Sequence, residues 1–133
     1  MRAEVNKCLE VLSKGGLILY PTDTVWGIGC DATIDSAIKK IFKLKQRSDS
    51  KALISIVSSY DQLKKLTHIT KEISFEKPTT VIYNNVKDIS KLAISADGTS
   101  AIRIVNDNFC QQLLSRFNKP IISTSANISK EDT

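Results

Sequence analysis

The amino-acid sequence predicts an α/β protein: a single domain with a twisted sheet, mixed or parallel in strand direction, and flanking helices. Short runs rich in Ile, Val and Thr alternate along the chain with stretches whose apolar residues recur at helical spacing. Several connections between these segments are short, which favours strands of mixed direction. The 133 residues, 41% of them hydrophobic, can form one core, so we expect one domain over residues 1–133.

The N-terminal part is expected to form a helix, a strand and then a loop. Apolar residues at helical spacing predict the helix, which Gly15 ends because glycine tolerates a left-handed conformation. These apolar residues are Val5, Cys8, Leu9 and Leu12. The apolar run 17–20 predicts a strand, and Pro21 ends it because proline cannot donate a ladder hydrogen bond. Residues 22–29 are therefore expected to begin as a loop.

The rest of the chain predicts three more helices and four more strands. Residues 34–41 predict a helix with Thr33 as its N-cap and an end near Gln46. The further helices are a short one around Leu63 and Leu66, capped by Ser59, and one over 109–117, capped by Asn106 or Asp107 and ended before Pro120. The further strands are 52–57, 79–83, 100–105 and 121–123.

The composition favours an anionic partner. Lys and Arg exceed Asp and Glu by 19 to 14, which gives a formal charge of +5. The basic residues are scattered and aromatic residues make up only 6%, whereas a nucleic-acid surface usually combines a basic stripe with aromatics. Nucleotides or pyrophosphate are the first expectation, and an RNA-binding module is kept as the second.

The cysteine pattern predicts neither a zinc site nor a disulfide framework. Cys8, Cys30 and Cys110 lie far apart and include no Cys-x-x-Cys pair. Cys8 and Cys110 fall on the apolar faces of predicted helices, where cysteine behaves as a small hydrophobe. No apolar run is long enough to span a bilayer, so we expect a cytoplasmic protein without a membrane partner.

Three polar segments follow predicted strands or a helix end: 22–29, 45–47 and 124–127. Ligands of open α/β sheets bind beyond the carboxyl ends of strands. Lys45 and Arg47 would point the same way in an extended chain and could hold anionic oxygens, or they could oppose a helix dipole. Ser125 and Asn127 have the same spacing and offer neutral hydrogen bonds, or they are ordinary turn residues.

Taken together, these segments match the sequence motifs of one family and occur in the same order along the chain. Gly15 to Ala32 reads GGLILYPTDTVWGIGCDA, Lys45-x-Arg47 follows, and Ser123 to Asn127 reads STSAN. Between them stand Lys77-Pro78-Thr79-Thr80 and Ala101-Ile102-Arg103-Ile104. In these motifs, which extend over nearly the whole chain, the sequence resembles the YrdC family of threonylcarbamoyl-AMP synthases.

The resemblance implies a reaction with three substrates: ATP, L-threonine and bicarbonate. The threonine amine is carboxylated, and the carbamate attacks the α-phosphate of ATP and releases pyrophosphate. The product, threonylcarbamoyl-AMP, is the precursor of the N6-threonylcarbamoyladenosine modification of tRNA. The resemblance also implies Mg²⁺ carried by ATP, with no metal held by protein side chains. It leaves tRNA, double-stranded RNA and the threonylcarbamoyl-transferase complex open as partners.

The resemblance also assigns residues to a site. It implies that the catalytic group is Lys45, Arg47, Ser125 and Asn127. It implies that the substrate-binding group is Thr22, Asp23, Thr24, Thr80, Arg103 and Ser123. Within this group Thr22 and Thr24 would contact threonine and Thr80 would lie near the nucleotide. Asp23 would either orient the amine or cap its loop.

The sequence departs from the family pattern in several places. Ser48 replaces the proline that usually follows the arginine of Lys-x-Arg. Glu76-Lys77-Pro78 occurs where many members have Pro-Gly-Pro, and Ser129-Lys130 occurs where the family commonly has Ser-Gly. Family members also continue beyond a position equivalent to Thr133, so the domain lacks the family's C-terminal segment. A binding-only remnant of the enzyme is therefore an alternative to a working synthase. The carbamoyl-adenylate-forming domain of hydrogenase maturation proteins is a further alternative, although such a domain normally sits inside a much longer chain.

Overall fold

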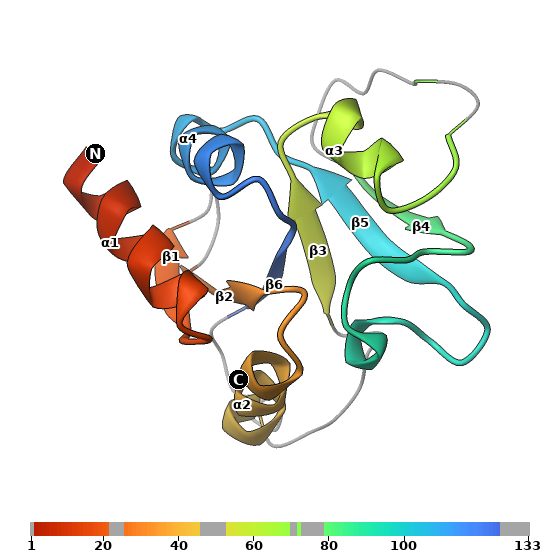
Figure 1. The fold of residues 1–133 in the computed structure, drawn as a ribbon, viewed down its shortest axis with the longest axis horizontal. Coiled ribbons are helices and arrows are strands. Elements are labelled where there is room, and N and C mark those ends of the chain that lie inside the picture. The colour runs from red at the N-terminus through yellow and green to blue at the C-terminus, as the bar shows by residue number, and fades with distance from the viewer. Residues whose placement is uncertain (1, 22–25, 46–52, 70–71, 73–78, 126–133) are drawn as a thin grey trace.

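The computed structural model describes residues 2–21, 26–45, 53–69, 72 and 79–125. Within them, helices lie on both faces of one six-stranded sheet (Figure 1). The helices are α1 (Arg2–Ser13), α2 (Asp35–Lys45), α3 (Tyr60–Lys64), α4 (Asn108–Phe117) and the short 3₁₀ helix η2 (Lys91–Ala93). The strands are β1 (Ile18–Pro21), β2 (Trp26–Asp31), β3 (Ile54–Val57), β4 (Thr80–Tyr83), β5 (Ser100–Ile104) and β6 (Ile121–Ser125).

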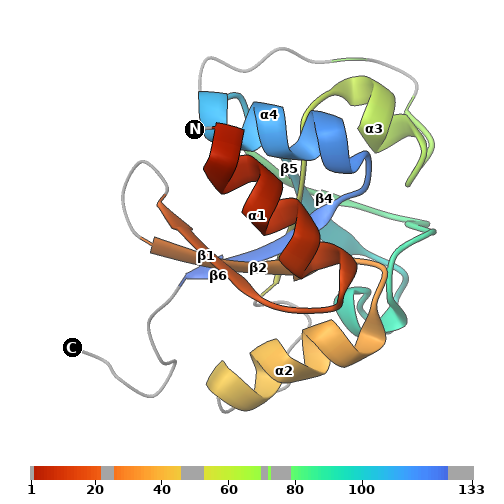
Figure 2. The ribbon, with the colours of Figure 1, turned by 60° about the vertical axis from the view of Figure 1, so that its left-hand side comes forward.

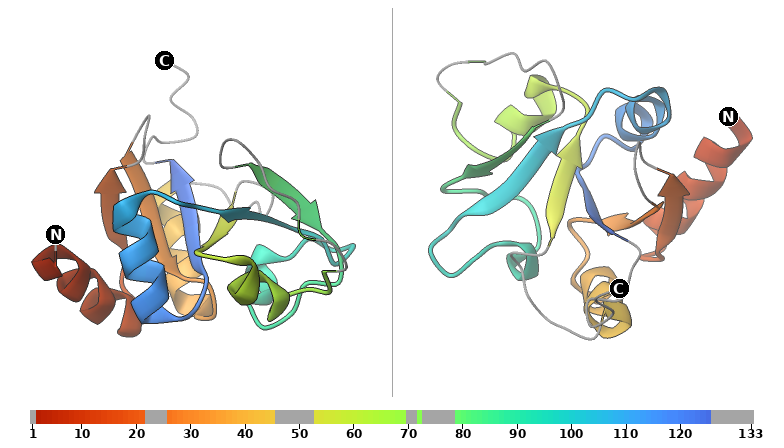
Figure 3. Two further views of the ribbon diagram at one scale, coloured as in Figure 1. Left: turned by 90° about the horizontal axis from the view of Figure 1, so that it is seen from above. Right: turned by 180° about the vertical axis from the view of Figure 1, so that it is seen from behind.

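The sheet has the strand order β1-β2-β6-β3-β5-β4. Of the pairs in the described residues, β3 and β5 run parallel and the others are antiparallel, which confirms the predicted mixed sheet. The last strand, β6, lies between β2 and β3, as the view from behind shows (Figure 3). This insertion places residues 121–125 beside residues 27–31, although they are far apart in the sequence.

Each face of the sheet buries its own apolar cluster. Helices α1 and α4 lie side by side on one face, and α2 lies on the other (Figure 2). The α1/α4 cluster is buried around Leu12, Ile56 and Leu114, whereas the α2 cluster contains Ile38 and Ile102. Burial of such aliphatic side chains is worth roughly 1.5 to 3 kcal/mol each, so these two layers fix the sheet between the helices.

Three helix ends are set by residues that the sequence predicted for them, Gly15, Ser59 and Asp107. Ser59 caps α3 by accepting a hydrogen bond from Gln62 N, and Asp107 caps α4 by accepting one from Cys110 N. Gly15 has φ +78° and its N–H donates to Leu12 O, which ends α1 in the left-handed conformation that glycine permits. The capping residues of these helices were thus predictable from local sequence alone.

Two local predictions are wrong. The segment expected to be a loop from residue 22 contains strand β2, which begins at Trp26. Its glycines disfavour a strand intrinsically, but its residues pair with β1 on one side and β6 on the other. Thr33 does not cap α2, because its N–H and its hydroxyl both donate to the carboxylate of Asp31. The helix begins two residues later, at Asp35.

The described residues contain neither a disulfide nor a membrane-spanning helix. Cys8, Cys30 and Cys110, all in the described residues, form no disulfide: Cys30 and Cys110 are buried, and Cys8 is half-buried at the edge of the α1/α4 cluster. In the described part of the chain, no three His, Cys, Asp or Glu side chains gather in a way that could hold a metal ion. No helix among the described residues has the length and apolar character needed to cross a membrane.

Candidate functional site

The register of the sheet places four of the predicted site residues on one face. Thr80 on β4 lies opposite Arg103 on β5, and Arg103 lies opposite Ile56 on β3. Ile56 lies opposite Ile121 on β6, so Ser123 and Ser125, two and four residues further along β6, point to the same side. The registers of these four strands thus agree that Thr80, Arg103, Ser123 and Ser125 share a face with the helices α1 and α4.

Arg103 and Thr80 are in direct contact. The Nε atom of Arg103 donates a hydrogen bond of 2.8 Å to the Thr80 hydroxyl oxygen. Both side chains are half-buried. This bond uses one of the five N–H donors of the guanidinium and fixes its plane, which leaves the terminal nitrogens able to approach a carboxylate or phosphate.

Lys45 and Ser125 meet although they are 80 residues apart in the sequence. Lys45 is the last residue of α2, and its ammonium group donates to the main-chain carbonyl oxygen of Ser125 at 2.9 Å, with Ser125 Oγ 3.5 Å away. Only 7% of Lys45 is exposed, whereas its neighbour Lys43 is exposed. A buried ammonium is expensive unless it is paired, so Lys45 is not an ordinary solvated cation at a helix end.

The contact ties the end of α2 to the end of β6. The first residue of the Lys-x-Arg segment is therefore held against the first residue of the Ser-x-Asn segment. Arg47 and Asn127 lie outside the described residues, as do Thr22, Asp23 and Thr24. The structure thus brings Lys45 and Ser125 together and leaves the other half of each pair undescribed.

A residue that sequence reasoning did not assign, Tyr20, also belongs to this region. Its hydroxyl is hydrogen-bonded to Ser123 Oγ, and only 2% of the residue is exposed. Burial raises the pKa of Tyr20 to about 12, so the phenol is protonated at neutral pH. The hydrogen bond with Ser123 and, to a smaller extent, the guanidinium of Arg103 have the opposite effect on that pKa. In the sequence, Tyr20 reads simply as the last apolar residue of a strand.

Beside Tyr20, a groove of about 590 Å³ runs between α1 and the β1–β2 hairpin. Its lining residues are Glu4, Lys7, Cys8, Leu19, Tyr20, Trp26 and Phe109. Trp26 and Leu19 are 56% and 62% exposed there. The lining is mainly apolar, so the groove differs in character from the basic and hydroxyl-rich face that carries Arg103 and Ser125.

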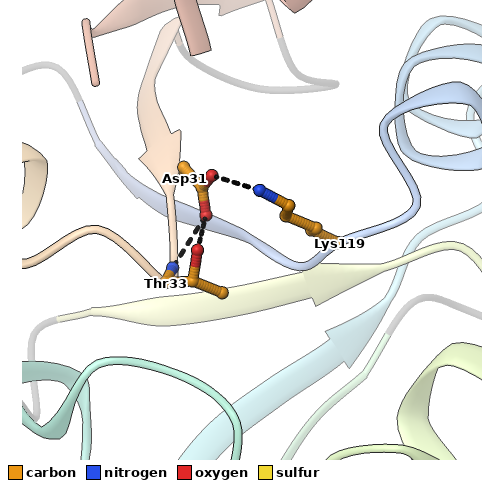
Figure 4. A network of polar contacts seen from close by, with 3 residues as sticks. All are labelled: Asp31, Thr33 and Lys119. Carbon is orange, nitrogen blue, oxygen red and sulfur yellow. Dashed lines mark hydrogen bonds and ion pairs between the residues drawn. The ribbon is translucent and has the colours of Figure 1, made fainter. Parts of the chain in front are cut away.

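Asp31 was also missed, and its role is to hold the end of β2. It is fully buried, and its carboxylate accepts hydrogen bonds from Thr33 N and Thr33 Oγ1 at 2.8 and 2.6 Å. Lys119, which precedes β6, contacts the second carboxylate oxygen at 3.2 Å (Figure 4). The ion pair joins the C-terminal end of β2 to the start of β6, the strand that carries Ser123 and Ser125.

Comparison with known proteins identifies the family of the chain. A family model named Sua5_yciO_yrdC and described as telomere recombination matches residues 10–133. A threonylcarbamoyl-AMP synthase of Psychromonas ingrahamii is 42% identical over 140 residues, which cover 96% of this chain and 72% of that protein. A protein of the same name from Saccharophagus degradans is 35% identical over 131 residues, covering 93% of this chain and 69% of that one.

A solved structure shows the same fold. The crystal structure of P. abyssi Sua5 complexed with L-threonine superposes with a TM-score of 0.82 at 27% identity. The match covers 97% of this chain but only 40% of the Sua5 chain. Since the family model spans residues 10–133 and relatives at 35% and 42% identity cover nearly the whole chain, this chain belongs to the Sua5/YciO/YrdC family.

Proposed function

We propose that the chain binds ATP and L-threonine and joins them, through a carbon derived from bicarbonate, into threonylcarbamoyl-AMP. The observation that carries this proposal is the contact between Lys45 and Ser125, which unites two short motifs from opposite ends of the chain. Relatives at 35% and 42% identity bear the name threonylcarbamoyl-AMP synthase, and a structural neighbour was solved with L-threonine. These comparisons support an enzyme of the nucleotidyltransferase type.

The chemistry suits a site built from cations and hydroxyl groups. The threonine amine adds to bicarbonate with loss of water, which forms a carbamate. A carbamate oxygen then bonds to the α-phosphorus of ATP while the bond to the β-phosphate oxygen breaks, so pyrophosphate leaves with the electron pair. Negative charge accumulates on the phosphate oxygens, and such steps depend on positioning and charge stabilisation more than on a protein nucleophile.

In this proposal each described residue has a defined task. Lys45 and Arg103 provide positive charge for phosphate or carboxylate oxygens, since both are fixed by hydrogen bonds. Thr80, Ser123 and Ser125 are the hydroxyl-bearing residues of the same face. Arg47 and Asn127 complete the two motifs, and the segment 22–24 contributes the threonine contacts.

Mg²⁺ enters the proposal as the companion of ATP. The described residues offer no cluster of carboxylate, imidazole or thiolate ligands, so the oxygen donors for the ion would be the phosphates themselves. When bound, the ion would neutralise part of the phosphate charge. The protein's share is then to align the nucleotide with Lys45 and Arg103.

The test measures binding and turnover in one preparation. Calorimetric titrations of ATP, L-threonine, L-serine and L-valine are followed by an assay of pyrophosphate release. We expect threonine to bind best, serine modestly less well because it lacks one methyl group, and valine much less well because it cannot pair with groups placed for a hydroxyl. Equal affinity for all three amino acids would contradict the proposal.

Two further outcomes separate the alternatives. Threonine-dependent pyrophosphate release supports a synthase, while selective binding without release identifies a binding-only domain. Affinity for RNA that falls steeply with salt, together with no heat from threonine or ATP, would favour an RNA-binding module. The titrations, the pyrophosphate assay and an added titration with RNA therefore decide among the three functions.

A further inference from the structure

The position of the Tyr20 ring is restricted by contacts with two glycines, Phe109 and Ser123. On β2, a side-chain carbon added at Gly27 would lie 3.0 Å from the Tyr20 ring, and one added at Gly29 would lie 3.1 Å from it. The ring therefore packs closely against both glycines, and a side chain at either position would require the ring to move by a few tenths of an ångström. The ring also stacks on Phe109 of α4, with centroids 6.4 Å apart and planes 23° apart.

The phenol hydroxyl of Tyr20 is hydrogen-bonded to Ser123 Oγ. A phenol is more acidic than an aliphatic alcohol, so the phenol is the better donor, and burial keeps the pKa of Tyr20 at about 12 and its proton in place. Either hydroxyl could donate in this contact, but with the phenol as donor the Ser123 oxygen accepts from Tyr20 and the Ser123 hydrogen is available for another acceptor. Ser123 is only half-buried and shares its face with Arg103 and Ser125, so that hydrogen can reach the open side.

We propose that Tyr20 is a positioning residue, which holds the Ser123 hydroxyl in one rotamer with its hydrogen directed at an anionic oxygen of the bound substrate. This proposal rests on the proposed function, which supplies that oxygen as a threonine carboxylate or an ATP phosphate. Gly27 and Gly29 then have a shared purpose in the motif. They make room for the ring that fixes the serine.

The first experiment tests the positioning without any ligand. Three-bond couplings measured by nuclear magnetic resonance report the χ1 rotamer of Ser123 in the wild-type chain and in Tyr20→Phe, which retains the ring but loses the hydroxyl. We expect one rotamer in the wild type and averaging in the variant. Tyr83→Phe is the matched control, since Tyr83, which is half-buried, is also a tyrosine on a strand. Tyr83 pairs with Ser100 of β5, whose hydroxyl donates to Ala93 O in η2, so this tyrosine lies away from Ser123. A single Ser123 rotamer in Tyr20→Phe would overturn the proposal.

The second experiment tests the consequence for binding. Dissociation constants for ATP and for L-threonine are measured separately in Tyr20→Phe, Ser123→Ala and the double variant. We expect Ser123→Ala to weaken one of the two ligands about 10-fold or more, and Tyr20→Phe to weaken the same ligand about 3- to 10-fold. The double variant should match Ser123→Ala within about 2-fold, because Tyr20 acts only through that serine.

The pattern of results identifies the ligand and separates the two proposals. Weaker ATP binding assigns the Ser123 hydroxyl to a phosphate, and weaker threonine binding assigns it to the carboxylate. Additive losses, or an equal loss in Tyr83→Phe, would mean that Tyr20 contributes only to general stability. If the wild-type chain bound neither ligand, the proposed function would fail, while the rotamer measurement would still decide the role of Tyr20.

Discussion

Ser123 and Ser125 each form a hydrogen bond with a side chain that is remote in the sequence. Tyr20, 103 residues away, contacts the Ser123 hydroxyl, and Lys45, 80 residues away, donates to the Ser125 carbonyl oxygen. Motif reasoning placed Lys45 and Ser125 in one catalytic group and identified Ser123, but it did not pair Ser123 with Tyr20. The alternation of a strand predicts which residues share a face, whereas the partner across the sheet depends on a strand order that local patterns do not contain.

Asp31 gives a prediction about stability at the same scale. Replacing Asp31 by Ala removes the acceptor of two hydrogen bonds from Thr33 and one from Lys119, all made by a fully buried carboxylate. We expect a loss of roughly 2 to 3 kcal/mol in the free energy of unfolding, measured by urea denaturation. Glu10→Ala is the control: it removes an ion pair with Lys14 whose side chains are 70% and 75% exposed, and should leave stability unchanged. Equal effects would show that Asp31 is not a structural anchor.

Arg47 gives a prediction about ligand binding. Arg47→Ala should weaken ATP binding by about 10-fold or more, since a guanidinium that pairs with phosphate contributes charge-assisted hydrogen bonds. Lys39→Ala removes the same charge from an exposed position on α2 and should change the affinity less than about 2-fold. Isothermal calorimetry at one salt concentration makes the comparison. Similar losses in the two variants would mean that diffuse positive charge alone attracts the nucleotide.

At the scale of elements, the sequence predicted every described α-helix and five of the six strands. The exception is β2, because Gly27 and Gly29 reduce strand propensity and Pro21 suggests that the strand region has ended. The strand forms nonetheless, since β1 and β6 pair with it and the Tyr20 ring covers its glycines. Thr33 is a second example. The sequence shows that Asp31 is nearby, but not that its buried carboxylate accepts a hydrogen bond from the Thr33 hydroxyl.

Helix α4 offers a test of a cap that was predictable. The Asp107 carboxylate accepts a 3.0 Å hydrogen bond from Cys110 N, one of the first N–H groups of the helix. Asp107→Ala should lower the free energy of unfolding by about 1 kcal/mol, while Asp107→Asn, which keeps an acceptor, should lower it by much less. Thermal denaturation of both variants provides the comparison. If the two substitutions were equally costly, the carboxylate charge and not the cap would be the stabilising feature.

At the scale of the whole molecule, the site exists because the chain returns to the middle of its own sheet. Strand β6 fills the place between β2 and β3, so Ser123 and Ser125 lie beside β2, and Ser125 also contacts the end of α2. The fold class and the mixed strand direction were predictable from segment types and connection lengths. The position of β6 was not, since it is decided by the burial of Ile121 and Ile122 in opposite clusters on the two faces.

Two buried acids on neighbouring strands predict how the whole fold responds to alkali. Burial raises the pKa of the Cys30 thiol from 9.0 to about 12 and that of the Tyr20 phenol from 10.0 to about 12. The unfolded chain therefore loses these protons at a lower pH than the folded chain does. Their favourable contribution is complete below about pH 9 and is lost as the pH rises to about 12.

We expect the free energy of unfolding to fall across that range, by up to about 1.4 kcal/mol per pH unit for each group. Urea denaturation at pH 8, 9, 10 and 11, with a phosphine reductant, measures the slope. Cys30→Ala should be less stable at pH 8, because it leaves a small cavity, and yet show a shallower decline. Cys8→Ala is the control: Cys8 is half-buried, so its removal should change the slope less. The free energy of unfolding of Cys30→Ala could instead fall as steeply with pH as that of the wild type. The thiol would then lose its proton at the same pH in the folded and unfolded chains, which would require water to reach the core between β2 and α2.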